Sequence, residues 1–442
     1  MTSGTNILAR LSGRPPGEPR ARPAMWALVD CACFYCSCER LFRPDLADKP
    51  VVVLSNNDGC VVAITPEAKA LGFKRGEVFF QSRDRLLAAG VAVFSSNYAL
   101  YGDISRRVAL AMESVTPAIS QYSIDEAFVP FSRTLACQAD EVGRALLGRV
   151  RRWVGVPVRV GMGPTRTLAK LANHWAKKLG PVLRLEQGSP LLEELLFQTP
   201  LEDVWGVGRR LSVKLASLGL KSAGDLRNFN AVRAGRLFSV TLERTVNELN
   251  GRQCVDNDLE PSPRKSLVSS RSFASGIKSK VELAQALAHH CAAAGEKLRA
   301  GDMAASVLSI HIATSRHADS PFQAGAAVEL GAPTSSTPAL IRASQLALER
   351  CFKPGPSYRQ AGVMLLELRP NKSHLPNLLA PPPEVVKSDD LMRALDLIND
   401  RHGRGTVKFL AQGGAKPTWA MRQERLSDLS TTDWDKLPNV KA

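Results

Sequence analysis

Acidic residues are scarce in this chain of 442 residues: 42 Asp and Glu stand against 58 Lys and Arg, which leaves a formal net charge of +16. A basic surface gains free energy when it displaces counterions from a polyanion, so nucleic acid is the leading class of partner. An anionic membrane is the competing class. However, no uninterrupted apolar run approaches the ~20 residues that span a bilayer, so the sequence predicts no transmembrane helix and no membrane partner.

A secretion signal and a disulfide pattern are also missing. Residues 1–24 contain several arginines and prolines and no apolar core, which predicts a disordered N-terminal extension rather than a cleaved signal. This stretch is either a flexible tail or upstream of a true start at Met25. The nine cysteines are odd in number and unevenly placed, which argues against a disulfide framework and favours a reducing cytoplasm.

The pattern of apolar runs and turn residues predicts a mixed α+β protein with roughly three to five domains. Strand-like and helical segments alternate through the first half, and the chain becomes helical from Leu191 to Gly251. Asn57-Asp58-Gly59 lies between two β-branched runs, which is a hairpin signal. A Pro-rich break is followed by strands around two helices, then by a linker-like stretch and a small C-terminal unit.

Four cysteines crowd into the stretch VDCACFYCSCER, Val29 to Arg40. A structural zinc site needs four ligands that converge, and these usually come from two pairs separated by a longer loop. No histidine and no second cysteine pair lies nearby. We therefore favour small buried apolar side chains over a metal-thiolate site.

Acidic residues end two of the apolar runs. Asp30 closes the first strand-like run, and Asp125-Glu126 follow a second one in YSIDEAF. A carboxylate at the end of a buried strand is costly unless it binds something positive. If the two strands pair, three carboxylates meet, and such a cluster suits a two-metal phosphoryl-transfer site. The alternative is three unrelated exposed acids, and spacing alone leaves both interpretations open.

Several motifs in order along the chain resemble those of the Y-family translesion DNA polymerases, and most closely the UmuC-type proteins, the catalytic subunit of bacterial DNA polymerase V. The similarity runs from about Met25 to the C-terminus and includes GRGTVKFLAQG, Gly403 to Gly413, in the C-terminal extension of that subfamily. The other matching motifs are DCACFYCSCE, SNNDGCVVA, EAKALG, FSSNYALYGDIS, YSIDEAF, GPTRTLAKLANHWAKK and VWGVGRR.

The resemblance implies an α+β multidomain, right-hand polymerase fold with a ferredoxin-like palm, small fingers, a helical thumb, an α+β little finger and a small C-terminal extension. The expected boundaries are 1–24 for the disordered extension, 25–36 and 97–188 for the palm, 37–96 for the fingers, 189–255 for the thumb with a helix-hairpin-helix, 266–370 for the little finger, 371–388 for a linker and 389–442 for the UmuC-type extension.

The resemblance also assigns roles at the metal site. Asp30 and Asp125 would bridge two Mg²⁺ ions, and Glu126 would complete the metal that activates the primer 3′-hydroxyl. The backbone carbonyl of Cys31 would add a ligand, which is consistent with the preference of Mg²⁺ for oxygen. Tyr35 matches the steric gate that excludes a ribose 2′-hydroxyl. The alternative interpretation is that the Tyr35 ring is only packed against the helix.

Further residues would bind the nucleotide and the DNA. Besides the steric gate, the resemblance implies that Phe34, Lys69 and Lys170 bind the nucleotide. The two lysines would be the cations that bind the triphosphate. Without the resemblance, Lys170 would be interpreted as an ordinary surface lysine. Gly206 and Gly208 would let backbone amides approach a DNA phosphate, unless they only form a turn between packed helices. Basic and hydroxyl side chains alternate along the next predicted strand: Arg264, Lys265, Ser269 and Arg271. They would suit contacts with DNA phosphates. Alternatively, they mark a solvated edge strand.

The expected function is error-prone, template-directed DNA synthesis past damaged bases in the SOS response, by a DNA-directed DNA polymerase without a proofreading nuclease. The expected partners are primer-template DNA, dNTPs, a processed UmuD dimer, a RecA filament and a sliding clamp, in the bacterial cytoplasm at the nucleoid. The clamp would bind a degenerate peptide near His374–Leu379, unless this is a plain linker. The alternatives are a catalytically silent, polymerase-like DNA-binding scaffold, and a nucleotidyl cyclase with the same palm layout.

Overall fold

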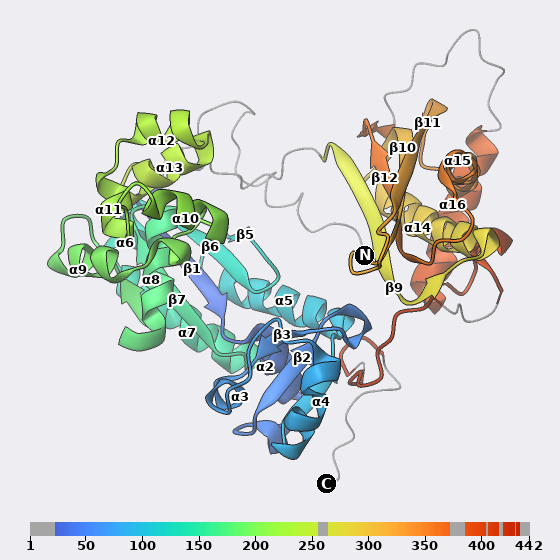
Figure 1. Ribbon diagram of the computed structural model, residues 1–442. Coiled ribbons are helices and arrows are strands. Elements are labelled where there is room, and N and C mark those ends of the chain that lie inside the picture. Colours follow the sequence, from blue (N-terminus) through green and yellow to red (C-terminus); the bar gives the residue numbers. More distant parts are fainter. Residues whose placement is uncertain are drawn as a thin grey trace.

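The computed structural model describes residues 23–254, 264–371, 385–403, 405–414, 419–428 and 430–433, and Figure 1 shows how its elements are arranged. The disorder expected for residues 1–24 therefore falls almost entirely outside the described residues. Most of the linker expected at 371–388 also lies outside them, but residues 385–388 are described and belong to a helix. Helices and strands occur throughout the described ranges, which confirms a mixed α+β chain with several cores. No described helix combines the length and the apolar character needed to cross a membrane.

A central five-stranded sheet has the strand order β5-β6-β1-β7-β8. Its middle strand β1 pairs antiparallel with both β6 and β7, so both of its edges are hydrogen-bonded, and the apolar run before Asp30 is buried. The five strands are β1 (Met25–Cys31), β5 (Ser120–Gln121), β6 (Glu126–Phe131), β7 (Val158–Gly163) and β8 (Val182–Arg184).

Helices cover both faces of the central sheet. Residues of α2 (Phe34–Leu41), α5 (Tyr98–Glu113) and α7 (Ala139–Val154) share one core with alternate residues of β1, and α8 (Arg166–Leu179) packs on the opposite face (Figure 1). Helix α8 lies very close to β7, and only glycine fits at position 161: a Cβ added there would lie 2.1 Å from the backbone nitrogen of Asn173. The short helix α6 (Arg133–Cys137) connects β6 to α7.

A small three-stranded sheet, β3-β2-β4, forms a separate core with α3 and α4. The antiparallel pairing of β2 with β3 confirms the hairpin predicted around Asn57. The predicted short helix is confirmed as α3: Thr65 caps its N-terminus and Pro66 is its first residue. The elements are β2 (Val51–Leu54), β3 (Val61–Ile64), α3 (Pro66–Ala70), α4 (Phe79–Ala88) and β4 (Ala92–Ser95).

A helical unit follows the central sheet and packs its own core against the outer side of α8. This agrees with the helical stretch predicted between Leu191 and Gly251. Its helices are α9 (Pro190–Gln198), α10 (Arg209–Ala216), α11 (Ala223–Asn228), α12 (Ala231–Leu237) and α13 (Val240–Leu249).

The outer unit consists of a second sheet, ordered β11-β10-β12-β9 with β13 paired to β10, and two helices that share its core. This confirms the predicted arrangement of strands around two helices. The strands are β9 (Ser266–Ile277), β10 (Met303–Thr314), β11 (Gln323–Thr334), β12 (Tyr358–Leu366) and β13 (Arg369–Pro370), and the helices are α14 (Lys280–Ala300) and α15 (Thr337–Cys351).

The C-terminal tail, residues 385–433, begins with α16 (Val385–His402) and contains a 3₁₀ turn, η6 (Leu410–Gln412). Trp419 of the tail is buried in the core of the outer unit. Further along, Arg425 exchanges hydrogen bonds with Ser95 of the small sheet. The tail therefore contacts two units that lie far apart in the sequence, and Figure 1 shows it passing from one to the other.

Candidate active site

The carboxylates predicted to form one site lie at adjacent ends of β1 and β6. Asp30 is paired with Glu126 in the antiparallel register of the two strands. The backbone N–H of Cys31 donates to the carbonyl oxygen of Asp125 at 2.9 Å. The pairing that the sequence left open is therefore present, and it brings Asp30, Asp125 and Glu126 together at one end of the central sheet.

Each of the three side chains has a different protein partner. Arg159, opposite Asp30 on β7, forms an ion pair with the Asp30 carboxylate. Asp125 Oδ1 accepts a hydrogen bond from Ser123 Oγ at 2.5 Å. Glu126 Oε2 accepts one from Lys170 Nζ at 2.6 Å. Within the described ranges, no three His, Cys, Asp or Glu side chains converge closely enough to hold a metal ion.

Burial and the neighbouring carboxylates both disfavour the charged form of Asp30. Burial is the largest cause that raises the pKa of Asp30 above its ordinary value, and the nearby charges of Glu126 and Asp125 raise it further, while Arg159 opposes the shift. The donors are oxygen atoms of three carboxylates, which is the donor set that Mg²⁺ prefers. The residues present therefore fit a divalent metal in kind, once their side chains turn from their present partners.

The cysteines beside this site are structural. Cys31, Cys36 and Cys38 are buried, and burial raises the pKa of each of the three thiols. Cys33 adopts a left-handed conformation, with φ of 47°, and turns the chain from β1 into α2. The interpretation of these residues as small buried side chains is confirmed for Cys31, Cys36 and Cys38, and Cys33 is half-buried.

Tyr35 is half-buried on α2 and stacks on Tyr101, with ring centroids 4.5 Å apart. It also meets Tyr98 edge-on at 6.2 Å. Burial is the main cause that raises the pKa of the Tyr35 phenol, and the charge of Asp125 contributes. The ring is thus close to the carboxylate end of the sheet. Its neighbour Phe34 points instead into the core of the central sheet.

The two predicted triphosphate-binding lysines lie in different surroundings. Lys69 is exposed on α3, without an ion pair to any residue in the described part of the chain. Lys170 is held between Glu126 and aromatic rings, with its Nζ atom 4.4 Å from the ring centroid of Tyr122 and 5.4 Å from that of Trp205. The structure therefore places Lys170 directly at the carboxylates and Lys69 on a separate helix.

Sequence reasoning missed three residues that contact this site: Arg159, Tyr122 and Trp205. Arg159 alternates with buried residues along β7, but only the strand register shows that it faces Asp30. The indole Nε1–H of Trp205 donates to the hydroxyl oxygen of Tyr122 at 3.2 Å, which joins the helical unit to the central sheet across 83 positions of sequence. No local pattern marks such a contact.

The predicted DNA-contact residues lie at two places. Gly206 has φ of 88°, which favours glycine, and Gly208 is the N-cap of α10. Arg264 and Lys265 are exposed just before β9.

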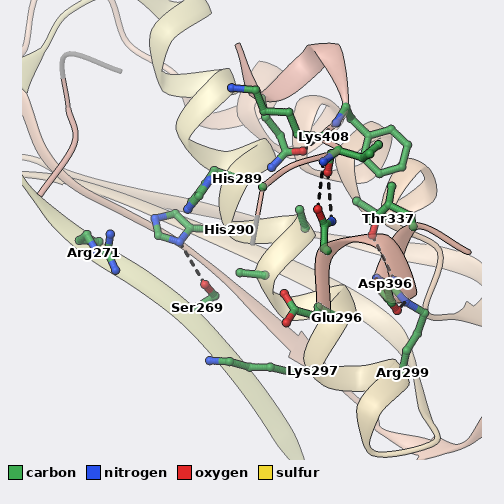
Figure 2. Close-up of a pocket in the computed structure, with 18 of the residues that line it drawn as sticks. Ser269, Arg271, His289, His290, Glu296, Lys297, Arg299, Thr337, Asp396 and Lys408 are labelled. Carbon is green, nitrogen blue, oxygen red and sulfur yellow. Dashed lines mark hydrogen bonds and ion pairs between the residues drawn. The ribbon is translucent and has the colours of Figure 1, made fainter. Parts of the chain in front are cut away.

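Ser269 and Arg271, the other predicted contacts on this strand, face α14. Ser269 Oγ lies 3.0 Å from Nδ1 of His290, and Figure 2 shows Ser269 and Arg271 beside a cavity that α14 also lines. Ser269 and Arg271 therefore do not share one open face with Arg264 and Lys265.

Comparison with known proteins identifies the class: the chain is a UmuC-type Y-family DNA polymerase. The chain belongs to the impB/mucB/samB family, whose models match residues 29–174 and, as its C-terminal domain, residues 264–378. Residues 389–440 match a domain of unknown function, DUF4113. The enzyme class is therefore DNA-directed DNA polymerase.

Several curated proteins are similar along nearly the whole chain. Protein ImpB of Salmonella typhimurium is 41% identical over 423 residues, which cover 94% of this chain and 99% of that protein. Protein UmuC of Salmonella typhimurium strain LT2 is 40% identical, with 94% and 100% covered. DNA polymerase IV of Oceanobacillus iheyensis is 30% identical over 52% of this chain and 54% of its own length.

Proposed function

We propose that this protein synthesises DNA across damaged template bases, without proofreading, in the SOS response of a bacterium. The single observation that carries the proposal is the pairing of Asp30 with Glu126, with Asp125 adjacent, at the end of the central sheet. The names UmuC and DNA polymerase IV of the similar proteins support it. The substrates would be primer-template DNA and dNTPs, in the cytoplasm at the nucleoid.

In this proposal the units take the layout of a right hand. The central sheet is the palm, the small sheet the fingers, the helical unit the thumb and the outer unit the little finger, with the boundaries given above. Gly206, Gly208, Arg264, Lys265 and Arg271 would contact DNA phosphates. For Arg271, this requires a strand or loop of nucleic acid on the side of β9 that faces α14.

The chemistry would follow from the residues at the carboxylate end. Asp30, Asp125, Glu126 and the Cys31 carbonyl would hold two Mg²⁺ ions, which, when bound, activate the primer 3′-hydroxyl and stabilise the charge on the leaving pyrophosphate. Lys69 and Lys170 would bind the triphosphate and orient it for in-line attack. Tyr35 would exclude a ribose 2′-hydroxyl by contact with the sugar, and Phe34 would support it from the core.

A second candidate function is a catalytically silent DNA-binding scaffold. It is favoured by one observation: Arg159, Ser123 and Lys170 already hold the three carboxylates. The proposed partners, a processed UmuD dimer, a RecA filament and a sliding clamp, would suit either function. The clamp peptide expected near His374–Leu379 lies outside the described residues.

Primer extension on undamaged and abasic templates separates the two functions. The test compares the native chain, the double variant Asp125→Asn, Glu126→Gln, and a control, Glu141→Gln, which changes an exposed carboxylate on α7. Each is assayed with Mg²⁺, with and without processed UmuD and RecA. The polymerase proposal expects extension by the native chain and the control only. Equal DNA binding without extension by any of the three would leave the scaffold.

A further inference from the structure

The tail is anchored on the outer unit by both charge and apolar contact. Asp396 of α16 accepts two hydrogen bonds from the Arg299 guanidinium of α14, at 2.6 and 2.8 Å, as Figure 2 shows. Further along, Trp419 is only 4% exposed, and its ring lies 6.0 Å from that of Phe273 and 5.5 Å from that of His289. This end of the tail is therefore part of the outer unit's core.

The next residues of the tail leave the outer unit and bind the small sheet. The backbone N–H of Ser95 donates to the carbonyl oxygen of Arg425 at 2.9 Å, and the Arg425 N–H donates to Ser95 Oγ at 3.0 Å. Gln423 Nε2 donates to the carbonyl oxygen of Ser96 at 2.8 Å. Asn97 Nδ2 donates to Ser427 Oγ at 3.0 Å. The tail thus follows the end of β4 through successive polar contacts.

The turn after β2 joins all three parts. The Asn57 side chain accepts a hydrogen bond from the N–H of Arg422 at 3.0 Å and donates one to the carbonyl oxygen of Ser272 on β9 at 2.9 Å. Asp58 Oδ2 accepts from the N–H of Glu424 at 3.0 Å. Asn57 and Asp58 both have left-handed backbones, with φ of 60° and 51°, a conformation that Asn and Asp adopt more readily than other residues except glycine. This turn presents both side chains to the tail.

We propose that the tail is a tie that holds the outer unit against the small sheet and so fixes their distance. A tail that served only to complete the outer unit would need no contacts beyond Trp419. Instead, its bonds to Asn57, Asp58 and Ser95 continue where the outer unit ends. This gives a function to the region whose family model is a domain of unknown function, and it does not depend on the chemistry proposed for the carboxylates.

The direct contact between the two units includes the bond from Asn57 to Ser272. The tail adds several bonds to the small sheet and a buried anchor on the outer unit. Because Asn57 takes part in both, loss of the tail would also weaken the direct contact. Release of the tail should therefore let the outer unit move relative to the small sheet.

The test removes small-sheet acceptors for the tail and leaves the tail's own sequence unchanged. The variant Asp58→Gly, Ser95→Ala in the full chain loses the side-chain acceptors for the N–H groups of Glu424 and Arg425 and keeps the direct bond from Asn57 to Ser272. Glycine also accommodates the left-handed backbone at position 58. The matched control, Asp203→Gly, Ser217→Ala, changes exposed residues of the helical unit. One measurement is the rate of tryptic cleavage after Arg422 and Arg425. The other is the distance distribution between spin labels on bioorthogonal residues at the exposed positions Lys74 and Arg342.

We expect cleavage at the two arginines to become at least about tenfold faster in the variant, since it follows the population of released tail. We also expect a longer and broader label distance, with both readouts unchanged in the control. Faster cleavage with an unchanged distance would overturn the proposal, because the tail would then bind the small sheet without holding the outer unit. Unchanged cleavage, or an equal change in the control, would overturn it too. None of these readouts depends on polymerase activity.

Discussion

The carboxylate end of the central sheet and the contact between the tail and the small sheet are built in opposite ways. The first gathers charges: Asp30 with Arg159 and Glu126 with Lys170, partly buried. The second relies mainly on neutral main-chain, amide and hydroxyl groups, such as Asn57 and Ser95, together with one carboxylate, Asp58. These bonds join residues more than 300 positions apart. A few charged groups should therefore dominate the chemistry, whereas the tie should depend on many bonds of similar, small weight.

Asp30→Asn should have the largest effect on activity, because it removes one of the charged groups of the first region. Burial raises the pKa of Asp30 above its ordinary value, so folding favours the neutral form. Asp30 therefore adds stability below its ordinary pKa, and this stability is lost as the pH rises through the raised pKa. Removing the charge should lower primer extension by about a thousandfold, the effect of losing several kcal/mol of metal-based stabilisation. The melting temperature at pH 8 should not fall.

Primer extension and thermal unfolding check this pair of outcomes together. Asp140→Asn, an exposed carboxylate on α7, is the control. A large fall in melting temperature for Asp30→Asn would show that the Arg159 pair outweighs burial, contrary to the expectation.

Tyr35→Ala should have the next largest effect, on selectivity rather than rate. If the ring contacts the sugar, its loss should reduce discrimination against ribonucleotides by about a hundredfold, within the range that one steric contact provides. The measurement is kcat/KM for dCTP against CTP. Tyr35→Phe keeps the ring and the stacking on Tyr101, so it should discriminate like the native chain. Equal discrimination by the Ala variant would assign Tyr35 to packing alone.

Arg159→Gln should have a moderate effect on metal binding. The guanidinium competes with a metal ion for the Asp30 carboxylate, and a partly buried pair of this kind contributes roughly 1 kcal/mol, or about fivefold in an equilibrium. We therefore expect half-maximal extension at a lower Mg²⁺ concentration. Tightened Mn²⁺ binding, followed by electron paramagnetic resonance without DNA, provides a readout apart from activity. Arg184→Gln, which breaks an ion pair with Glu186, should leave both unchanged.

Asn57→Ala alone should have the smallest effect. It removes two hydrogen bonds, each with a net contribution of about 1 kcal/mol. These bonds are part of a contact spread over several residues, and no core side chain is removed. We expect a shift of only a few degrees in the melting temperature of the small sheet, measured by differential scanning calorimetry, and unchanged primer extension on undamaged DNA. A loss of activity comparable to that of Asp30→Asn would show that the two regions are not separable.

Local sequence patterns predicted much of the fold. The apolar run before Asp30, the turn at Asn57 and the cap at Thr65 each indicated an element that the structure contains. These signals succeed because strand burial, turn geometry and capping depend on neighbours in the sequence. The three carboxylates could be found for the same reason, since each borders an apolar run: Asp30 lies near the end of β1, and Asp125 and Glu126 lie at the start of β6.

Partners across strands and units could not be predicted in this way. Arg159 faces Asp30 only because of the register between β1 and β7. On β9, alternation indicated two faces, but only the packing of α14 decides that Ser269 and Arg271 lie on the inner one. The tail contacts are harder still, because main-chain donors such as the N–H of Arg422 carry no sequence signal.

The length of chain between Asn57 and Arg422, 365 positions, has a consequence for biosynthesis. The small sheet leaves the ribosome early and can fold at once, since domains generally fold as units during synthesis, N-terminal first. Its partner in the tail follows only after the central sheet, the helical unit and the outer unit have been made. The arrangement of the small sheet with the outer unit is therefore completed only once the tail has been translated, and a product cut short before Arg422 would contain every carboxylate yet lack the tie.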